Sequence, residues 1–243
     1  ATTLLSSNEG SNNWIVYAND TLGHLNSSNV TFIVDTINPL ISYGDGTPSA
    51  NSYLGNSIFV NVSVTEANFA NITYILNNYT SNGASVRQYN TTVFDTLTNS
   101  ITWPGLIDGK YRFNVTIIDL SNNINASASR IVYVDTVAPS VSVDLPTNTT
   151  YSSTNVSINF TFATHGLGVT EAPLQSLWFY NGTGNESYTD ATIIYRTYPE
   201  GSNWFIAYGN DSVGNVDTTF VYFSVATAIP AITIDLPTNT TYT

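Results

Sequence analysis

The sequence predicts an all-β protein built from small sandwich domains in tandem, and two observations support this. The 243 residues include 30 Asn, 61 Ser plus Thr and 27 Tyr plus Phe, against one Lys and four Arg. Thr, Val, Ile and aromatic residues favour strands, whereas Asn, Gly and Pro mark turns. The sequence also repeats itself at intervals of 91 to 100 residues, which is long enough for a separate small domain in each repeat.

Two blocks of sequence define the repeat. The segment Asp144–Tyr151 returns letter for letter at Asp235–Tyr242, and prolines mark the same junction at Pro39, Pro139 and Pro230. A second block, 9–20, resembles 200–211, with a weaker copy at 108–119, and its final aspartates are 99 and 92 residues apart. Periods this long indicate tandem domains and not the turns of a solenoid.

Alternation of apolar and polar residues places the strands. Segments 58–64 and 156–162 look like equivalent second strands, and the strand before each final aspartate keeps one parity apolar. The residues predicted to face a core are Ile58, Val60, Val62, Val64, Val156, Ile158, Phe160 and Phe162, and in the later strand Trp14, Val16, Phe113, Val115, Phe205 and Ala207.

Each final aspartate, Asp20, Asp119 or Asp211, begins a tight turn. An aspartate at such a position can accept hydrogen bonds from backbone N–H groups ahead of it, and the Gly or Asn that follows tolerates a positive φ. A last strand comes next, at 30–34, 130–134 and 220–225, and then a crossing segment that ends at a junction proline. Proline cannot donate to a ladder, so it suits a junction.

This order of features resembles a known family. A Tyr- or Trp-containing strand, an Asp-led hairpin, a last strand and then the motif VDTxxP at 34–39 and 134–139 resemble the tandem immunoglobulin-like repeats of large archaeal and bacterial surface proteins. The resemblance covers essentially the whole chain, and implies Ig-like (fibronectin III or bacterial Ig-like) sandwiches, an archaeal source and an extracellular, cell-surface location. The third junction, 225–230, lacks the aspartate.

The junctions divide the chain into four parts. We expect residues 1–36 to be the trailing part of one domain, 37–136 and 137–227 to be complete domains, and 228–243 to be the first strand of another. The two end segments hold 36 and 16 residues against 91 in the second complete domain, roughly 40 too few for a seven-stranded sandwich. This favours a window on a longer chain, whose signal and anchor lie elsewhere, over head-to-tail completion by a neighbouring copy.

Charge and cysteine content exclude several classes of partner. The net charge of −12 and pI near 4.1 oppose binding to nucleic acid and anionic lipid. The chain has no Cys, so disulfides and thiolate metal sites are excluded. No apolar run approaches the roughly 18 to 20 residues of a membrane-spanning helix, so we expect no direct membrane insertion.

The strongest chemical signal is the acceptor motif for N-glycosylation, Asn-x-Ser/Thr. It occurs sixteen times, where composition alone would give about seven. A strand whose outer face carries Asn, Ser and Thr also produces this triplet without any sugar. The motif asparagines are Asn19, Asn26, Asn29, Asn61, Asn71, Asn78, Asn90, Asn114, Asn125, Asn148, Asn155, Asn159, Asn181, Asn185, Asn210 and Asn239, of which Asn29, Asn78, Asn90, Asn148, Asn181 and Asn185 are favoured by predicted exposure.

The residues predicted to face away from the core, on the strand before each final aspartate, indicate a surface for lateral contact. It carries Ile15 and Tyr17 in one repeat and Ile206 and Tyr208 in another, against polar residues in the middle repeat. Such a face is a candidate sticky surface. Cover by a loop or neighbouring strand of the same domain is the alternative.

Catalytic and metal-binding residues are scarce, so we expect no enzyme and no catalytic site. His24 falls in a turn where other repeats have Asn, and His165 precedes a glycine-containing loop. Glu171, Glu186 and Glu200 are isolated and are expected to be solvated surface residues. No metal site is assigned. A calcium ion held by turn or junction carboxylates stays an alternative to simple turn caps, the carboxylates being Asp20, Asp35, Asp119, Asp135 and Asp211.

The sequence therefore predicts a structural protein, a segment or subunit of an N-glycosylated extracellular filament or cell-surface fibre. Its expected partners are copies of itself or neighbouring repeats of a longer chain, and its only expected non-protein groups are covalent glycans. The alternatives are a spacer or stalk region of a surface adhesin, and accessory repeats of a secreted polysaccharide-degrading enzyme.

Overall fold

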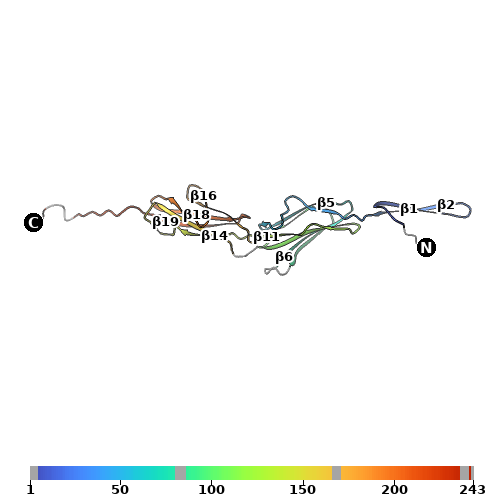
Figure 1. Ribbon diagram of the computed structural model, residues 1–243, viewed down its shortest axis with the longest axis horizontal. Helices are drawn as coiled ribbons and strands as arrows, with labels where there is room; N and C mark the ends of the chain where they lie inside the picture. The colour runs from blue at the N-terminus through green and yellow to red at the C-terminus, as the bar shows by residue number, and fades with distance from the viewer. Residues whose placement is uncertain (1–4, 80–85, 166–170, 236–240, 242–243) are drawn as a thin grey trace. The chain divides into compact units, whose positions relative to one another are not determined.

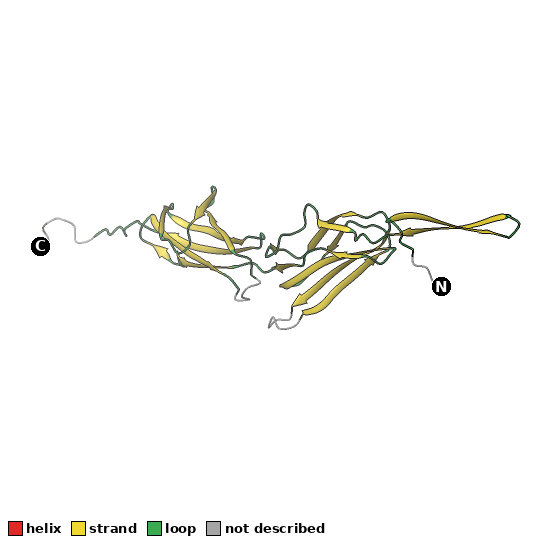
Figure 2. Ribbon diagram, turned by 45° about the vertical axis from the view of Figure 1, so that its right-hand side comes forward, coloured by secondary structure: helices red, strands yellow, loops and turns green. Residues whose placement is uncertain are grey.

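A computed structural model describes residues 5–79, 86–165, 171–235 and 241. The chain divides into two compact units, which we call unit 1 (residues 1–52 and 57–133) and unit 2 (residues 53–56 and 134–243). Strands and loops make up the described residues of both (Figure 1, Figure 2). The predicted all-β class is confirmed, whereas the four-part division by residue number stays a prediction.

Unit 2 is a sandwich of two sheets. A three-stranded sheet has the order β12-β14-β17 and a five-stranded sheet the order β13-β19-β18-β15-β16. The strands of the first sheet are β12 (Ser140–Leu145), β14 (Asn155–Ala163) and β17 (Ile194–Thr197). Those of the second are β13 (Thr150–Tyr151), β15 (Leu174–Tyr180), β16 (Asn185–Tyr188), β18 (Gly201–Asp211) and β19 (Val216–Val225).

The other sandwich repeats this arrangement. Its smaller sheet has the order β3-β5-β8, and its larger sheet the order β4-β11-β9-β6-β7 with β10 beside β9. The small sheet consists of β3 (Leu40–Tyr43), β5 (Ile58–Thr65) and β8 (Ser100–Trp103). The larger consists of β4 (Tyr53–Leu54), β6 (Phe69–Tyr79), β7 (Val86–Phe94), β9 (Gly109–Asp119), β10 (Ile124–Ala126) and β11 (Arg130–Val134).

The strand order identifies the fold. In each sandwich the first, third and sixth strands in chain order form one sheet (β3, β5 and β8, or β12, β14 and β17), and the remaining strands form the other. This is the Greek-key order of immunoglobulin-like domains. The predicted tandem Ig-like fold is therefore confirmed. Before the first sandwich, β1 (Gly10–Asn19) and β2 (Leu25–Val34) form a two-stranded antiparallel hairpin that corresponds by repeat to β18 and β19.

The predicted alternation holds in both sandwiches. The predicted core residues of the smaller sheets have no exposed surface, namely Ile58, Val60, Ile158 and Phe160. The same holds for those of β9 and β18 in the larger sheets, namely Phe113, Val115, Phe205 and Ala207. The two sheets of unit 2 share one core, in which Phe160 of β14 meets Phe179 and Phe205 at ring-centroid distances of 6.3 and 6.4 Å. Alternation therefore reflects burial between two layers.

The hairpin departs from the prediction. Trp14 and Val16, expected in a core, are 38% and 69% exposed. They occupy the repeat positions of Phe205 and Ala207, which are fully buried in unit 2. The reason is that β1 and β2 form a sheet of two strands only, with Phe32 in edge contact with Trp14 at 5.1 Å.

Residues 226–235 form no strand and are exposed throughout. By the repeat, Ile232 and Ile234 correspond to Val141 and Val143, which lie in or against the core of unit 2. Here the two isoleucines are 86% and 77% exposed. The second copy of the repeated eight-residue segment lies largely outside the described residues.

No helix among the described residues has the length and hydrophobicity needed to cross a membrane.

Two buried tyrosines make the stability of unit 1 sensitive to high pH. Burial raises the pKa of both Tyr74 and Tyr111 to about 12. Because a tyrosine in an unfolded chain has a pKa of about 10, the unfolded chain loses these protons first as the pH rises. The stabilisation is complete below about pH 10 and is lost progressively towards pH 12.

We expect absorbance titration of tyrosinate to show a group of tyrosines that ionise only as the protein unfolds. Tyr74→Phe and Tyr111→Phe should each weaken the dependence of unfolding on alkaline pH. Titration of every tyrosine near pH 10 in the folded protein would contradict this expectation.

Candidate functional site

The aspartate-led turns have the predicted chemistry. Asp119 Oδ1 accepts hydrogen bonds from the backbone N of Ser121 and of Asn123, both at 2.8 Å, and its Oδ2 accepts from Asn123 Nδ2 at 2.8 Å. Burial alone would raise the pKa of Asp119, but the bonds from Asn123 and Ser121 outweigh it and hold the pKa below its usual value. Asn122 takes a φ of 67°, as the turn prediction required.

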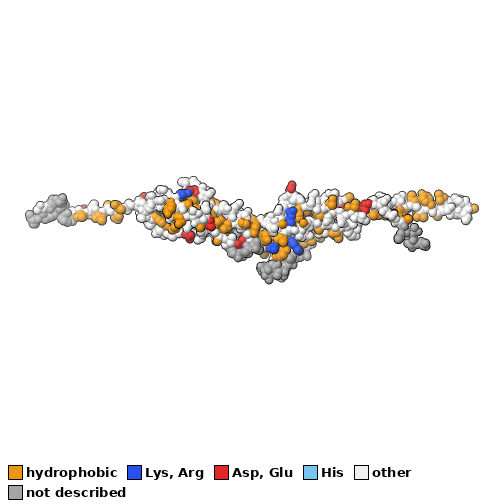
Figure 3. Space-filling model, in the orientation of Figure 1, with side chains coloured by type: hydrophobic (Ala, Val, Ile, Leu, Met, Phe, Trp, Pro, Cys, Tyr) orange, Lys and Arg blue, Asp and Glu red, His pale blue; other side chains and the backbone are white. Residues whose placement is uncertain are grey.

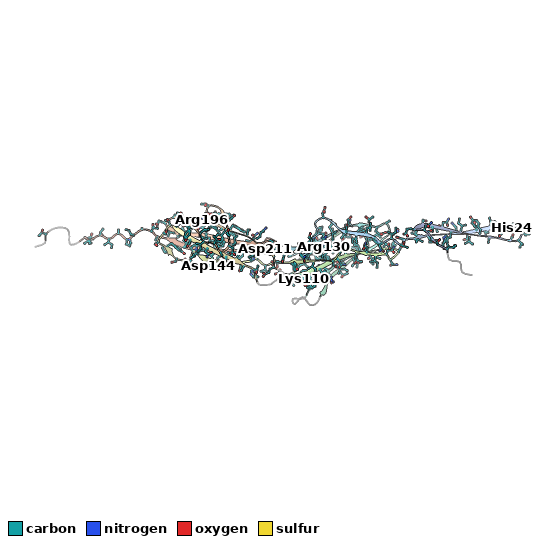
Figure 4. The ribbon with its side chains drawn as sticks, in the orientation of Figure 1. His24, Lys110, Arg130, Asp144, Arg196 and Asp211 are labelled. Carbon is teal, nitrogen blue, oxygen red and sulfur yellow. The ribbon has the colours of Figure 1, made fainter. Side chains whose placement is uncertain are left out.

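The same turn recurs in the hairpin and in unit 2. Asp211 accepts from Val213 N at 2.9 Å and from Asn215 N and Nδ2 at 3.0 and 2.8 Å. In the hairpin His24 takes the place of the asparagine, with its Nδ1 2.8 Å from Asp20 Oδ2. The histidine lies exposed at the hairpin tip (Figure 4), which confirms the predicted turn role.

Each turn asparagine also holds the crossing segment that precedes its own sandwich. Asn123 Nδ2 donates to the carbonyl oxygen of Asp35 at 3.1 Å, and Asn215 Nδ2 donates to that of Asp135 at 3.2 Å. The side chains of the same aspartates are also bound: Asp35 Oδ2 accepts from Asn68 Nδ2 at 2.8 Å, and Asp135 Oδ2 from Ala172 N at 2.6 Å. Backbone and side chain of the junction aspartate are therefore both fixed.

A second contact fixes the residue after the junction aspartate. Glu9 accepts hydrogen bonds from the backbone N and the hydroxyl of Thr36, at 2.9 and 2.8 Å. Glu200, its counterpart by repeat, accepts the same two groups of Thr227. The junction that lacks an aspartate thus keeps the threonine contact.

Three carboxylates meet at the start of the first sandwich. One oxygen from each of Asp35, Glu66 and Asp119 lies within 4.8 Å of the others. Calcium takes six to eight oxygen ligands, and Asp119 already accepts three hydrogen bonds. In unit 2 the counterparts Asp135, Glu171 and Asp211 line one cavity. The turn caps are confirmed, and the calcium alternative stays a prediction.

The histidine and glutamates considered for catalysis lie on the surface or pair with neighbouring side chains. His165 is exposed beside the unit 2 cavity. The prediction that the glutamates are solvated surface residues holds for Glu200, which is exposed and also binds Thr227. Glu186 is instead partly buried and forms an ion pair with Arg196 at 2.6 Å. The contacts of Glu186 and Glu200 join neighbouring strands or segments of unit 2, which is a structural role.

The acceptor asparagines fall into three groups by position. Seven are exposed, namely Asn19, Asn26, Asn29, Asn90, Asn148, Asn155 and Asn185. Eight are partly buried, namely Asn61, Asn71, Asn78, Asn114, Asn125, Asn159, Asn181 and Asn210. Asn239 lies outside the described residues. Among the six that were favoured, Asn78 and Asn181 are less exposed than expected.

Several partly buried asparagines use the very nitrogen to which a sugar would be attached. Asn61 Nδ2 donates to the Asp45 carbonyl at 3.1 Å, and Asn125 Nδ2 to the Pro39 carbonyl at 2.8 Å. Asn181 and Asn210 donate to the side chains of Glu186 and Gln175 at 2.6 and 3.0 Å. At these positions a sugar would replace one of the two N–H groups of a nitrogen that already donates a hydrogen bond.

Unit 2 carries an aromatic face on one of its sheets. It lies on the outer side of the five-stranded sheet, where β15, β18 and β19 present Trp178, Tyr180, Trp204, Ile206, Tyr208, Phe220 and Tyr222. Trp204, Phe220 and Tyr222 are 38%, 54% and 60% exposed. Hydrophobic side chains reach the visible surface of both units (Figure 3).

The rings of this face form cross-strand pairs. Trp178 stacks on Tyr208 with centroids 5.3 Å apart and an interplanar angle of 3°. Trp204 contacts Tyr180 at 5.8 Å and Phe220 at 6.1 Å. Trp178 of the neighbouring strand thus covers part of Tyr208, as the alternative to lateral contact expected, but the covering rings themselves extend the exposed face. Lateral contact between chains stays a prediction.

The alternation of apolar and polar residues in the sequence does not identify the other aromatic residues of this face. Trp178 and Tyr180 lie in the run Leu177–Tyr180, and Phe220 and Tyr222 in the run Phe220–Phe223, where every residue is apolar. A run that is apolar on both parities has no period of two, so the sequence gives no inward direction.

A scan against protein-family models finds no match, and a search of curated protein sequences finds no significant match. Solved structures do resemble this chain in fold. The fibronectin type III-like modules of Clostridium thermocellum CbhA are 13% identical, with 76% of this chain and 94% of that one covered and a TM-score of 0.42. Extracellular domains 3–5 of Drosophila OTK are 9% identical, with coverages of 89% and 71% and a TM-score of 0.40. The FN1–FN3 domains of chicken CNTN1 are 12% identical, with 87% and 75% covered and a TM-score of 0.35.

Proposed function

We propose that this chain is a structural segment of an N-glycosylated extracellular filament or cell-surface fibre built from tandem Ig-like domains. It acts mechanically and through its surfaces, and not as an enzyme. The supporting observation is the repeated junction: in both sandwiches the turn asparagine holds the carbonyl of the preceding junction aspartate. A fibre under tension requires linkers that are anchored to the domains they connect.

The surface composition supports glycosylation. Only 9% of residues are charged, well below the quarter usual in soluble domains. Sugars on exposed asparagines would hydrate such a surface and shield strand edges from pairing with other chains. In this role the glycans replace the charges of an ordinary soluble domain.

Several exposed apolar residues lie at repeat positions that are buried in unit 2, and these support the proposal of a partner. Trp14 and Val16 in the hairpin, and Ile232 and Ile234 after β19, occupy repeat positions that are buried or packed against the core in unit 2. Apolar surface of this kind is stabilised when further strands cover it. The partner we propose is a neighbouring repeat of a longer chain or another copy of this one.

Imaging of native cell-surface material by electron cryomicroscopy tests this function. A fibre with helical symmetry, repeated burial between chains and sugar density at the exposed asparagines is expected. Isolated rods with a binding domain at one end would instead favour the adhesin stalk, and a neighbouring catalytic domain would favour the accessory repeats of an enzyme. Rods with bare asparagines would contradict the proposal.

Site-resolved glycopeptide mass spectrometry of the native protein gives a second test. We expect sugar at the exposed Asn148 and Asn155, and little at Asn61 and Asn125, because their Nδ2 atoms already donate to backbone carbonyls. Equal occupancy at all four positions would show that these hydrogen bonds do not limit attachment.

A further inference from the structure

The aromatic face of unit 2 combines exposed rings with an absence of charge. The outer positions of β15, β18 and β19 are all described, and none carries a charged residue. Ser, Thr and Asn surround the rings, with Ser176 and Asn210 at one end and Ser202 and Ser224 at the other. An exposed apolar surface with a polar rim marks a surface that binds something.

A sugar acceptor lies on the same face. Asn185 is exposed on β16, the edge strand of the sheet, and its register partner is Tyr180 on β15. Ser187, which completes the acceptor motif, is the register partner of Trp178. The middle residue, Glu186, belongs to the opposite parity and pairs with Arg196. Register partners have Cβ atoms about 4.5–5.5 Å apart, so a sugar on Asn185 starts within reach of both rings.

We propose that the glycan on Asn185 folds over Trp178 and Tyr180 and covers the β15 side of the aromatic face. The proposal rests on the glycosylation proposed above. A sugar ring presents C–H groups that pack on an aromatic ring, and hydroxyls that bond to the Ser and Thr rim. A second copy of the chain would have to reach this face from solution, whereas a glycan on Asn185 is tethered beside the rings.

Covering the face this way protects the edge of the sheet as well. Strand β16 ends the order β13-β19-β18-β15-β16, so among the described residues one side of it has no partner within the sheet. A glycan on this strand blocks addition of a foreign strand.

Residue-resolved hydroxyl-radical footprinting of the full glycosylated chain tests the proposal. Asn185→Gln and Ser187→Ala both remove the acceptor motif, and each should raise the oxidation of Trp178 and Tyr180, because both rings gain solvent exposure when the sugar is lost. Ser187→Thr keeps the motif and should leave oxidation unchanged. So should Asn155→Gln, which removes an exposed acceptor on β14 in the other sheet. Repeating the experiment at several dilutions excludes cover by a second copy.

Glycopeptide mass spectrometry on the same samples separates the two proposals. If Asn185 carries sugar but its removal leaves Trp178 and Tyr180 unchanged, the folded-back glycan is wrong and glycosylation stands. If Asn185 is bare while other sites carry sugar, this inference is wrong and the general proposal survives. Bare asparagines throughout would overturn both.

Discussion

Replacing Phe160 with alanine should lower the free energy of unfolding of unit 2 by about 3–5 kcal/mol, the usual cost of truncating a buried phenylalanine. Phe160 has no exposed surface and joins the two sheets of the sandwich. Its ring lies 3.9 Å from that of Tyr188, and within 6.4 Å of those of Phe179 and Phe205. Alanine would leave a cavity that all three rings border.

Denaturant titration followed by near-ultraviolet circular dichroism measures this loss. Phe160→Leu, which keeps most of the volume, should cost less than half as much. Phe113→Ala, in the core of unit 1, is the matched variant for the other sandwich. A cost below about 1 kcal/mol for Phe160→Ala would mean that the two sheets do not depend on this ring.

Replacing Asp211 with alanine should cost about 2–3 kcal/mol, because three partly buried donors lose their acceptor. The carboxylate is 2% exposed and binds Val213 N, Asn215 N and Asn215 Nδ2. Asn215 also donates to the Asp135 carbonyl, so its loss of position should loosen the junction segment as well.

Asp211→Asn is the control for this prediction. An asparagine keeps an Oδ1 acceptor for the two backbone donors, so it should recover more than half of the lost stability. Thermal unfolding of the three proteins provides the comparison. Equal stability of wild type and Asp211→Ala would show that the turn needs no side-chain cap.

The two sandwiches were predictable because their strands alternate. In β5 and β14, apolar residues recur at every second position and, apart from Phe59, the residues between them are polar, so the buried set follows directly from that spacing. The turns were predictable for a different reason, since Asp119 and Asp211 act on backbone groups only two to four residues ahead. Local chemistry of this kind can be derived from sequence.

The junction contacts were not predictable from sequence. Asn123 and Asp35 are 88 residues apart, and Glu200 and Thr227 are 27 apart, so their pairing depends on how the strands assemble. In the hairpin, the sequence pattern predicted burial that the structure does not show. Trp14 has the pattern of a core residue, but burial requires a second layer of strands that the hairpin alone does not supply.

The central claim is that each repeat folds as a separate sandwich with its own core. Hydrogen-exchange mass spectrometry of the full chain carrying Phe160→Ala tests this most directly. The account predicts faster exchange throughout β12–β19, with β5, β6 and β9 unchanged from wild type. Faster exchange in both sets of strands would show one shared cooperative core and would contradict the account.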